Sequence, residues 1–197
     1  MLAIAFIAGM AVVPMALPLQ KMAIDIYSGS NVVVVWVVIE EVLKYAIALA
    51  LILWQREVDE PIDMVIYMMM VALGFAALEN ALFVFNPLVA EEYVQSILTG
   101  SFRFLGSTLL HVLASGTVGM VMALTYYKPR LSRVMYGTLG LFIAIVLHAL
   151  FNFSIMGSSG KKILTVFLFV WLGVILLFLL FEKVKILERN HNLTHSP

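Results

Sequence analysis

Residues 31–54 read NVVVVWVVIEEVLKYAIALALILW, an apolar run that is interrupted by Glu40, Glu41 and Lys44. A helix needs about 20 mostly apolar residues to cross a bilayer, and this run is long enough. An ionisable side chain at the centre of a bilayer costs about 2.5 to 3.5 kcal/mol on insertion scales. The run therefore predicts a transmembrane helix whose charged residues are paired or functional.

The whole chain shares this apolar character. Of its 197 residues, 63% are hydrophobic and 12% are charged, and the mean hydropathy is +1.05. Twelve Lys or Arg residues balance twelve Asp or Glu residues, so there is no broad basic surface for nucleic acid. The absence of cysteine excludes disulfides, thiolate metal sites and a cysteine nucleophile. Any metal would need His and carboxylate ligands.

Six apolar runs of membrane-spanning length predict an all-α polytopic membrane protein, a bundle of about six transmembrane helices. The runs are Met1 to Leu19, Asn31 to Trp54, Ile62 to Phe85, Phe102 to Tyr127, Val134 to Met156 and Ile163 to Glu182. We expect a single transmembrane domain over residues 1–183, with a motif-bearing core at about 31–156. A polar C-terminal tail over 184–197 is expected to fray.

Prolines bear on the first predicted helix and on the segment between the third and fourth runs. Pro14 and Pro18 are expected to kink or end the first helix. No Lys or Arg precedes the apolar part of that run, which favours a retained helix over a cleaved signal peptide. Between the third and fourth runs, Asn86 and Pro87 predict the start of a short amphipathic helix over Pro87 to Thr99, at the membrane interface.

Four ionisable side chains in four different runs share one depth, namely Glu40, Glu79, His111 and His148. Each lies about seven to nine residues from the predicted non-cytoplasmic end of its run, on the order of 10 to 14 Å at 1.5 Å per residue. Helices of opposite direction could place polar groups at any depth. Four coinciding depths therefore predict that these side chains meet in one polar centre.

Spacing along the runs supports a common site. His148 and Asn152 stand four residues apart and share a helix face, as do Ser107, His111 and Ser115. The two serines are small enough to let another helix or a substrate approach His111, so we take them as candidate substrate-binding residues. Alone, each polar group has a structural explanation as an ion pair or interhelical hydrogen bond. Together they supply a base, metal or oxyanion ligands and a donor.

Four short motifs follow one another along the chain: EExxK at Glu40-Glu41-Val42-Leu43-Lys44, FxxxE at Phe75-Ala76-Ala77-Leu78-Glu79, the lone His111, and HxxxN at His148-Ala149-Leu150-Phe151-Asn152. Their order on four successive runs, from about Asn31 to Met156, resembles the PrsW family of intramembrane proteases. That family is related to the CAAX-protease and bacteriocin-processing superfamily. The Lys of the first motif and the Glu of the second distinguish PrsW from that wider group.

The resemblance implies hydrolysis of a peptide bond in or next to a transmembrane segment, in a membrane-protein or membrane-anchored peptide substrate. It implies that a carboxylate activates the attacking water, with Glu40 as the first candidate for the general base and Glu41 as the second. Lys44 would pair with a carboxylate one turn away and keep it ionised.

The remaining motif residues would stabilise the reaction. By the same resemblance, His111 and His148 hold either a divalent metal such as zinc or the water and the oxyanion, and Asn152 orients or donates. Glu79 would complete a His, His, Glu metal set. Metal-dependent and metal-free glutamate chemistry both remain open at this point.

Two other classes of function fit parts of the pattern. Chains of Glu, Lys and His at bilayer depth also build ion and proton pathways in transporters. The absence of an inverted repeat and the clustering of polar groups at one level argue against that class. A catalytically inactive membrane scaffold would keep the polar centre for assembly alone.

The distribution of basic residues predicts that both termini face the cytoplasm. The side that holds the termini collects seven Lys or Arg residues: Arg56, Lys128, Arg130, Arg133, Lys183, Lys185 and Arg189. The other side collects Lys21, Lys161, Lys162 and the borderline Arg103. Reporter fusions at Pro197 and Ser159 should therefore report opposite sides of the membrane. A cytoplasmic Ser159 would contradict this topology.

Overall fold

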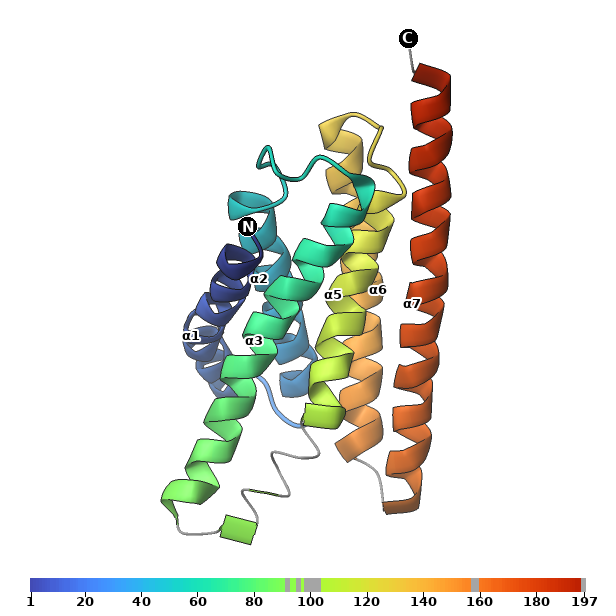
Figure 1. Ribbon diagram of the computed structural model, residues 1–197. Coiled ribbons are helices and arrows are strands. Elements are labelled where there is room, and N and C mark those ends of the chain that lie inside the picture. The colour runs from blue at the N-terminus through green and yellow to red at the C-terminus, as the bar shows by residue number, and fades with distance from the viewer. Residues whose placement is uncertain (91–92, 95–96, 98–103, 157–159, 196–197) are drawn as a thin grey trace.

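The structure is a computed structural model that describes residues 1–90, 93–94, 97, 104–156 and 160–195. Within these residues it contains six helices and no strand (Figure 1). The helices are α1 (Leu2–Ile26), α2 (Ser30–Leu51), α3 (Pro61–Val89), α5 (Ser107–Ala123), α6 (Arg130–Met156) and α7 (Gly160–His195). The predicted all-α bundle is confirmed.

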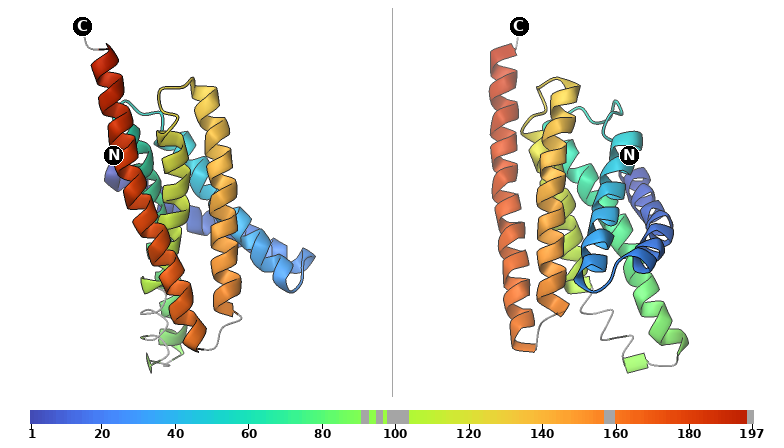
Figure 2. Two further views of the ribbon diagram at one scale, coloured as in Figure 1. Left: turned by 90° about the vertical axis from the view of Figure 1, so that its right-hand side faces the viewer. Right: turned by 180° about the vertical axis from the view of Figure 1, so that it is seen from behind.

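Helix α3 lies in the middle of the bundle and packs against α1 on one side and α5 on the other. Helix α5 in turn packs against α6 and α7, and α2 contacts α1, α3 and α6. Successive helices run in alternating directions, so both chain termini lie towards the same end of the bundle (Figure 1). Figure 2 shows α7 at the edge of the bundle.

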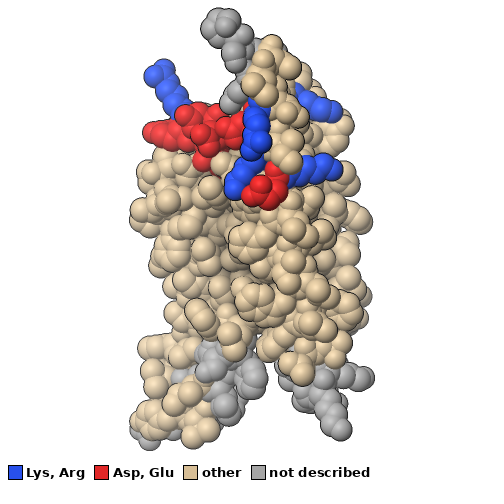
Figure 3. All heavy atoms as spheres, turned by 45° about the vertical axis from the view of Figure 1, so that its right-hand side comes forward, with Lys and Arg blue, Asp and Glu red and all other residues tan. Residues whose placement is uncertain are grey.

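The surface of the bundle fits a membrane. Four helices, α1, α3, α6 and α7, are long and apolar enough to cross one. Helix α2 carries Glu40, Glu41 and Lys44, and α5 has only 17 residues. On the face that Figure 3 shows, charged side chains gather at the end of the bundle near the C-terminus, and the middle is uncharged. The chain is an integral membrane protein.

Two helices continue through prolines that were expected to interrupt or start a helix. Helix α1 passes Pro14 and Pro18 and ends at Ile26, seven residues beyond the predicted end at Leu19. Helix α3 passes Pro87 and ends at Val89, so the predicted helix start at Asn86 and Pro87 is wrong. Neighbouring helices can hold a membrane helix together where proline removes a backbone hydrogen bond. Most of the remaining segment to Thr99 lies outside the described residues.

Helix α7 also extends beyond its predicted end at Glu182. It continues to His195, so the polar tail is helical rather than frayed. The exposed ion pair between Lys185 Nζ and Glu182 Oε1, at 3.0 Å, lies on this extension. The ring of His191 stacks on Tyr127, with centroids 3.6 Å apart, and so holds the extension against the loop between α5 and α6.

Glycines allow α3 to approach both of its neighbours closely. A Cβ atom on Gly9 of α1 would overlap the carbonyl of Val71, and one on Gly74 of α3 would overlap the carbonyl of Phe6. A Cβ atom on Gly119 of α5 would lie 2.5 Å from the carbonyl oxygen of Met64. Small residues at such crossings are typical of membrane helices, which associate through close packing. These contacts fix the positions of α1 and α5 on α3.

Replacing Gly74 by Ala should destabilise the protein by about 1 to 3 kcal/mol or more, because the obstructing atoms belong to the backbone of α1. Gly173→Ala is the matched control. The three atoms nearest to its new methyl group all belong to the side chain of Leu113, which borders a cavity and has space to move. Thermal unfolding in detergent should show a clear loss for the first variant and a small one for the second. Equal midpoints would contradict the close α1 to α3 crossing.

Candidate active site

An ion pair between Glu41 and Lys44 lies on the inward face of α2. Lys44 Nζ donates a hydrogen bond to Glu41 Oε1 at 2.5 Å. The side chain of Lys44 is 0% exposed and that of Glu41 is 1% exposed. The ring of Phe75 covers the ammonium group, with Nζ 4.7 Å from its centroid. A buried charge is tolerated only with such partners, because desolvation costs several kcal/mol per ion.

Glu41 also sets the orientation of His148 on α6. Its Oε1 accepts a hydrogen bond from His148 Nδ1 at 2.8 Å. Because a carboxylate can only accept, Nδ1 carries the proton, and Nε2 of the neutral ring carries a lone pair. That Nε2 lies 3.8 Å from Glu40 Oε2. Glu41 thus presents the basic nitrogen of His148 to Glu40.

Lys44 makes the corresponding contact to α5. Its Nζ donates to His111 Nδ1 at 3.1 Å, so the neutral His111 ring carries its proton on Nε2. Nε2 lies 3.3 Å from Glu79 Oε2 on α3, to which it donates. The His111 and His148 rings meet edge to face, with centroids 4.8 Å apart. One ion pair on α2 therefore organises both histidines.

Glu40 lines the cavity next to the histidines, and its two oxygens have different surroundings. Its Oε1 accepts a hydrogen bond from Gln20 Nε2 at 2.8 Å. Its Oε2 is buried and has no hydrogen-bond partner within the described part of the chain. Buried polar atoms without a partner are uncommon in native proteins and call for an explanation such as a catalytic role, a water or an ion. Glu40 Oε2 is therefore an oxygen that a water or an ion could approach at this site.

The four residues predicted to share one depth line a single cavity of about 560 Å³. Among the described residues, the lining is Val33, Trp36, Glu40, Glu79, Phe83, Ser107, His111, His148, Phe151, Asn152, Ile155, Met156 and Phe167. Ser107 begins α5 and Met156 ends α6, so the cavity reaches towards the end of the bundle opposite the termini. The structure brings Glu40, Glu79, His111 and His148 together.

The other predicted residues occupy different positions. Asn152 lines the cavity one turn from His148, and its amide makes no hydrogen bond within the described residues. Ser107 also lines the cavity. Ser115 is fully buried and does not line it, and its Oγ has no hydrogen-bond partner in the part of the chain that is described. Glu41 lies behind the cavity wall, on His148 and Lys44.

Sequence reasoning missed Gln20 and Trp36. Trp36 lines the cavity, and its Nε1 donates to the Gln20 carbonyl at 3.0 Å. The predicted first span ends at Leu19, one residue before Gln20, whereas α1 continues and carries Gln20 to Glu40. A polar side chain directly after an apolar run is the one available signal. It does not separate a helix end from a buried contact.

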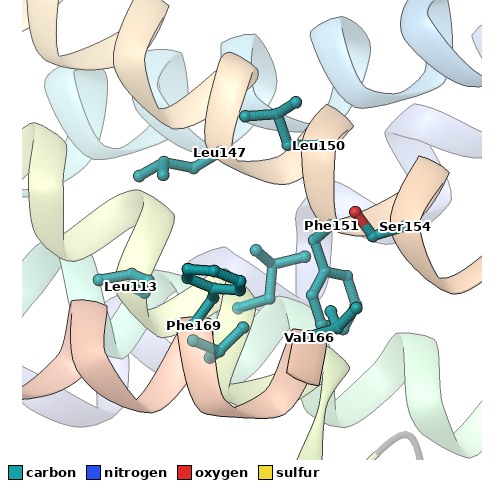
Figure 4. Close-up of a pocket in the computed structure, with 9 residues that line it drawn as sticks. Leu113, Leu147, Leu150, Phe151, Ser154, Val166 and Phe169 are labelled. Atoms are coloured by element: carbon teal, nitrogen blue, oxygen red, sulfur yellow. The ribbon is translucent and has the colours of Figure 1, made fainter. Parts of the chain in front are cut away.

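An apolar cavity of about 360 Å³ adjoins the polar one, between α5, α6 and α7 (Figure 4). Its lining is Leu110, Leu113, Leu147, Leu150, Phe151, Ser154, Val166, Phe169 and Val170. Phe151 lines both cavities and so forms part of the wall between them. The polar centre therefore has an apolar recess beside it.

Three of the polar residues suit a metal ion. Glu40, His111 and His148 each offer one ligand atom, and the three atoms lie within 4.8 Å of one another. Imidazole nitrogen and carboxylate oxygen are common ligands of Zn²⁺. The unpartnered Glu40 Oε2 and the lone pair on His148 Nε2 agree with such a ligand set. The carboxylate of Glu79 lies beside this group, with its Oε2 3.3 Å from His111 Nε2.

Comparisons with known proteins agree on one family. The family described as "PrsW family intramembrane metalloprotease" matches residues 1–180. Among similar proteins named Protease PrsW, that of Bacillus subtilis is 27% identical over 68% of this chain and 58% of its own length. The protein named Protease PrsW of Clostridioides difficile is 26% identical over 67% of this chain and 54% of its own length. The chain thus spans little more than half of these relatives. No solved structure gives a significant match.

Lys44→Met should destabilise the protein by about 3 to 5 kcal/mol, because it leaves the Glu41 carboxylate buried without its cation. Lys185→Met is the matched control. It breaks an ion pair with the same i, i+3 spacing on the exposed part of α7, where the expected cost is about 0 to 1 kcal/mol. Thermal unfolding of the two purified variants measures the difference. Similar stability of both would show that the buried pair does not hold the helices together.

Proposed function

The chain belongs to the PrsW family of intramembrane metalloproteases, and we propose that it is an endopeptidase that hydrolyses a peptide bond in or next to a substrate's transmembrane segment. One observation carries the proposal. Glu40 Oε2 is buried, has no partner among the described residues, and faces His148 Nε2 at 3.8 Å in a cavity large enough for water and a segment of peptide. These are the features of a general base beside its reactants.

We assign the base to Glu40 because Glu40 lines the cavity and Glu41 does not. Glu41 Oε1 accepts hydrogen bonds from both Lys44 Nζ and His148 Nδ1, and the side chain does not reach the cavity. Its role is to hold His148 in one orientation. Glu40 Oε2 keeps its lone pairs available, and it borders the cavity in which a substrate would lie.

The reaction then needs one proton to move twice. Glu40 Oε2 takes a proton from water while the water oxygen attacks the carbonyl carbon of the peptide bond. The carbonyl oxygen becomes negatively charged, and the side-chain amide of Asn152, which lines the cavity, donates a hydrogen bond to it. Glu40 passes its proton to the amide nitrogen as the carbon–nitrogen bond breaks. A new carboxyl and a new amino terminus result.

The family description implies a divalent metal, and this chain's residues fit one. Glu40, His111 and His148 would hold it, with Glu79 as a further carboxylate beside His111. With its Oε2 on the metal, Glu40 would not be a free base, and the metal would supply the activation of water in its place. A bound Zn²⁺ would polarise the peptide carbonyl and lower the pKa of water. The hydrogen bond from His148 Nδ1 to Glu41 fixes that ring, as outer-shell partners do in metal sites. His111 would bind through Nε2 only in its other tautomer, with the ring proton on Nδ1 in place of the hydrogen bond from Lys44.

The substrate is expected to enter from the side. A peptide bond within a helix is shielded by backbone hydrogen bonds, and an unwound segment is tolerated at bilayer depth only against protein or water. The polar cavity offers such a place, and the apolar recess behind Phe151 could take a large apolar side chain of the substrate. Cleavage would fall in the half of the segment that lies away from the termini of this chain.

Glu40→Gln should reduce cleavage of a model transmembrane peptide about 10²- to 10⁴-fold, the usual contribution of general base catalysis, without unfolding the protein. The amide keeps the shape of the side chain and can still accept the hydrogen bond from Gln20. Glu182→Gln, at an exposed carboxylate, should retain wild-type activity. Cleavage by purified protein in liposomes measures both. Full activity of Glu40→Gln would move the base to another residue.

A further inference from the structure

Glu40 lies between two cavities. On one side is the polar cavity with His111 and His148. On the other side is a cavity of about 380 Å³ between α1, α2 and α3, which is also lined by Gln20 and Trp36. A flexible glutamate at such a boundary has room to turn in either direction. Something must therefore hold it on the side of the histidines.

Gln20 is the group that contacts Glu40 from this second cavity. Its Nε2 donates to Glu40 Oε1 at 2.8 Å, and this is the hydrogen bond that α1 contributes to the polar centre. With Oε1 held from the α1 side, Oε2 points away from Gln20, and it lies 3.8 Å from His148 Nε2. The hydrogen bond thus holds one carboxylate oxygen on the α1 side and leaves the other facing His148.

Gln20 is itself held in place. Trp36 Nε1 donates to the Gln20 carbonyl at 3.0 Å and ties this turn of α1 to α2. Further along α1, the close crossing of Gly9 with α3 fixes the helix as a whole. The position of Gln20 is therefore set by packing at two places, neither of which depends on Glu40.

We propose that Gln20 is a positioning residue, which orients Glu40 Oε2 towards His111 and His148 for both catalysis and metal binding. This inference rests on the proposed function and adds a residue outside the four sequence motifs. Residues of this kind, which hold a metal ligand or a catalytic group from behind, typically contribute about 10- to 100-fold to metal affinity or activity.

Gln20→Met tests the proposal, since methionine keeps the length and most of the volume of glutamine and removes the amide donor. We expect kcat to fall about 10- to 100-fold with KM nearly unchanged, because substrate contacts remain while Glu40 loses its orientation. Titration of the metal-free protein with Zn²⁺ should show a similar loss of affinity. Gln55→Met is the matched control, because the side-chain amide of Gln55 donates to the carbonyl of Leu51 at an exposed position.

The same substitution in a Glu40→Gln variant distinguishes a role of Gln20 in orienting Glu40 from a role in helix packing alone. In Glu40→Gln protein, the further change Gln20→Met should leave Zn²⁺ affinity unaltered, because Gln20 acts through Glu40. Wild-type kcat and Zn²⁺ affinity in Gln20→Met would overturn the inference while leaving the protease proposal in place. Conversely, a wild-type protein that binds Zn²⁺ but cleaves no peptide would overturn the protease proposal, and the Zn²⁺ titration would still decide the role of Gln20. Absence of both activities would overturn both.

Discussion

A charged amine buried between membrane helices must find its partners within the fold, and Lys44 finds them on several elements at once. Its ammonium group contacts Glu41 on its own helix, His111 on α5 and the ring of Phe75 on α3. Glu41 extends the network to His148 on α6. Shifting any of these helices would leave a charge or a polar atom unpaired in an apolar interior, at a cost of several kcal/mol. The buried pair therefore specifies one arrangement of the bundle.

This constraint divides the work between two adjacent carboxylates. Glu41 is held by two donors and serves to orient the network. Glu40, one residue earlier, points to a different side of α2 and keeps Oε2 free of protein partners among the described residues. Neighbouring residues on a helix face directions about 100° apart, so one can lie in the core while the other borders a cavity. The sequence Glu-Glu thereby supplies one carboxylate that orients the buried network and one that borders the cavity, at the same depth.

Much of this could be predicted from the sequence. Apolar runs predicted the bundle. One polar centre was predicted from the depth that four residues share, namely Glu40, Glu79, His111 and His148. Hydropathy could not predict that α1 continues through its prolines to carry Gln20 to Glu40, since that depends on packing against α3. Nor could it choose between Glu40 and Glu41, because depth gives no information on the direction in which a side chain points.

The central claim is that this buried network supports hydrolysis at its own depth in the membrane. The most direct test is to incubate the purified protein in liposomes with a transmembrane peptide in water enriched in ¹⁸O, and to identify the products by mass spectrometry. The account predicts one ¹⁸O atom in the new carboxyl terminus, at a bond in the half of the segment away from the termini of this chain. Intact peptide, or a cut at the opposite end of the segment, would contradict it.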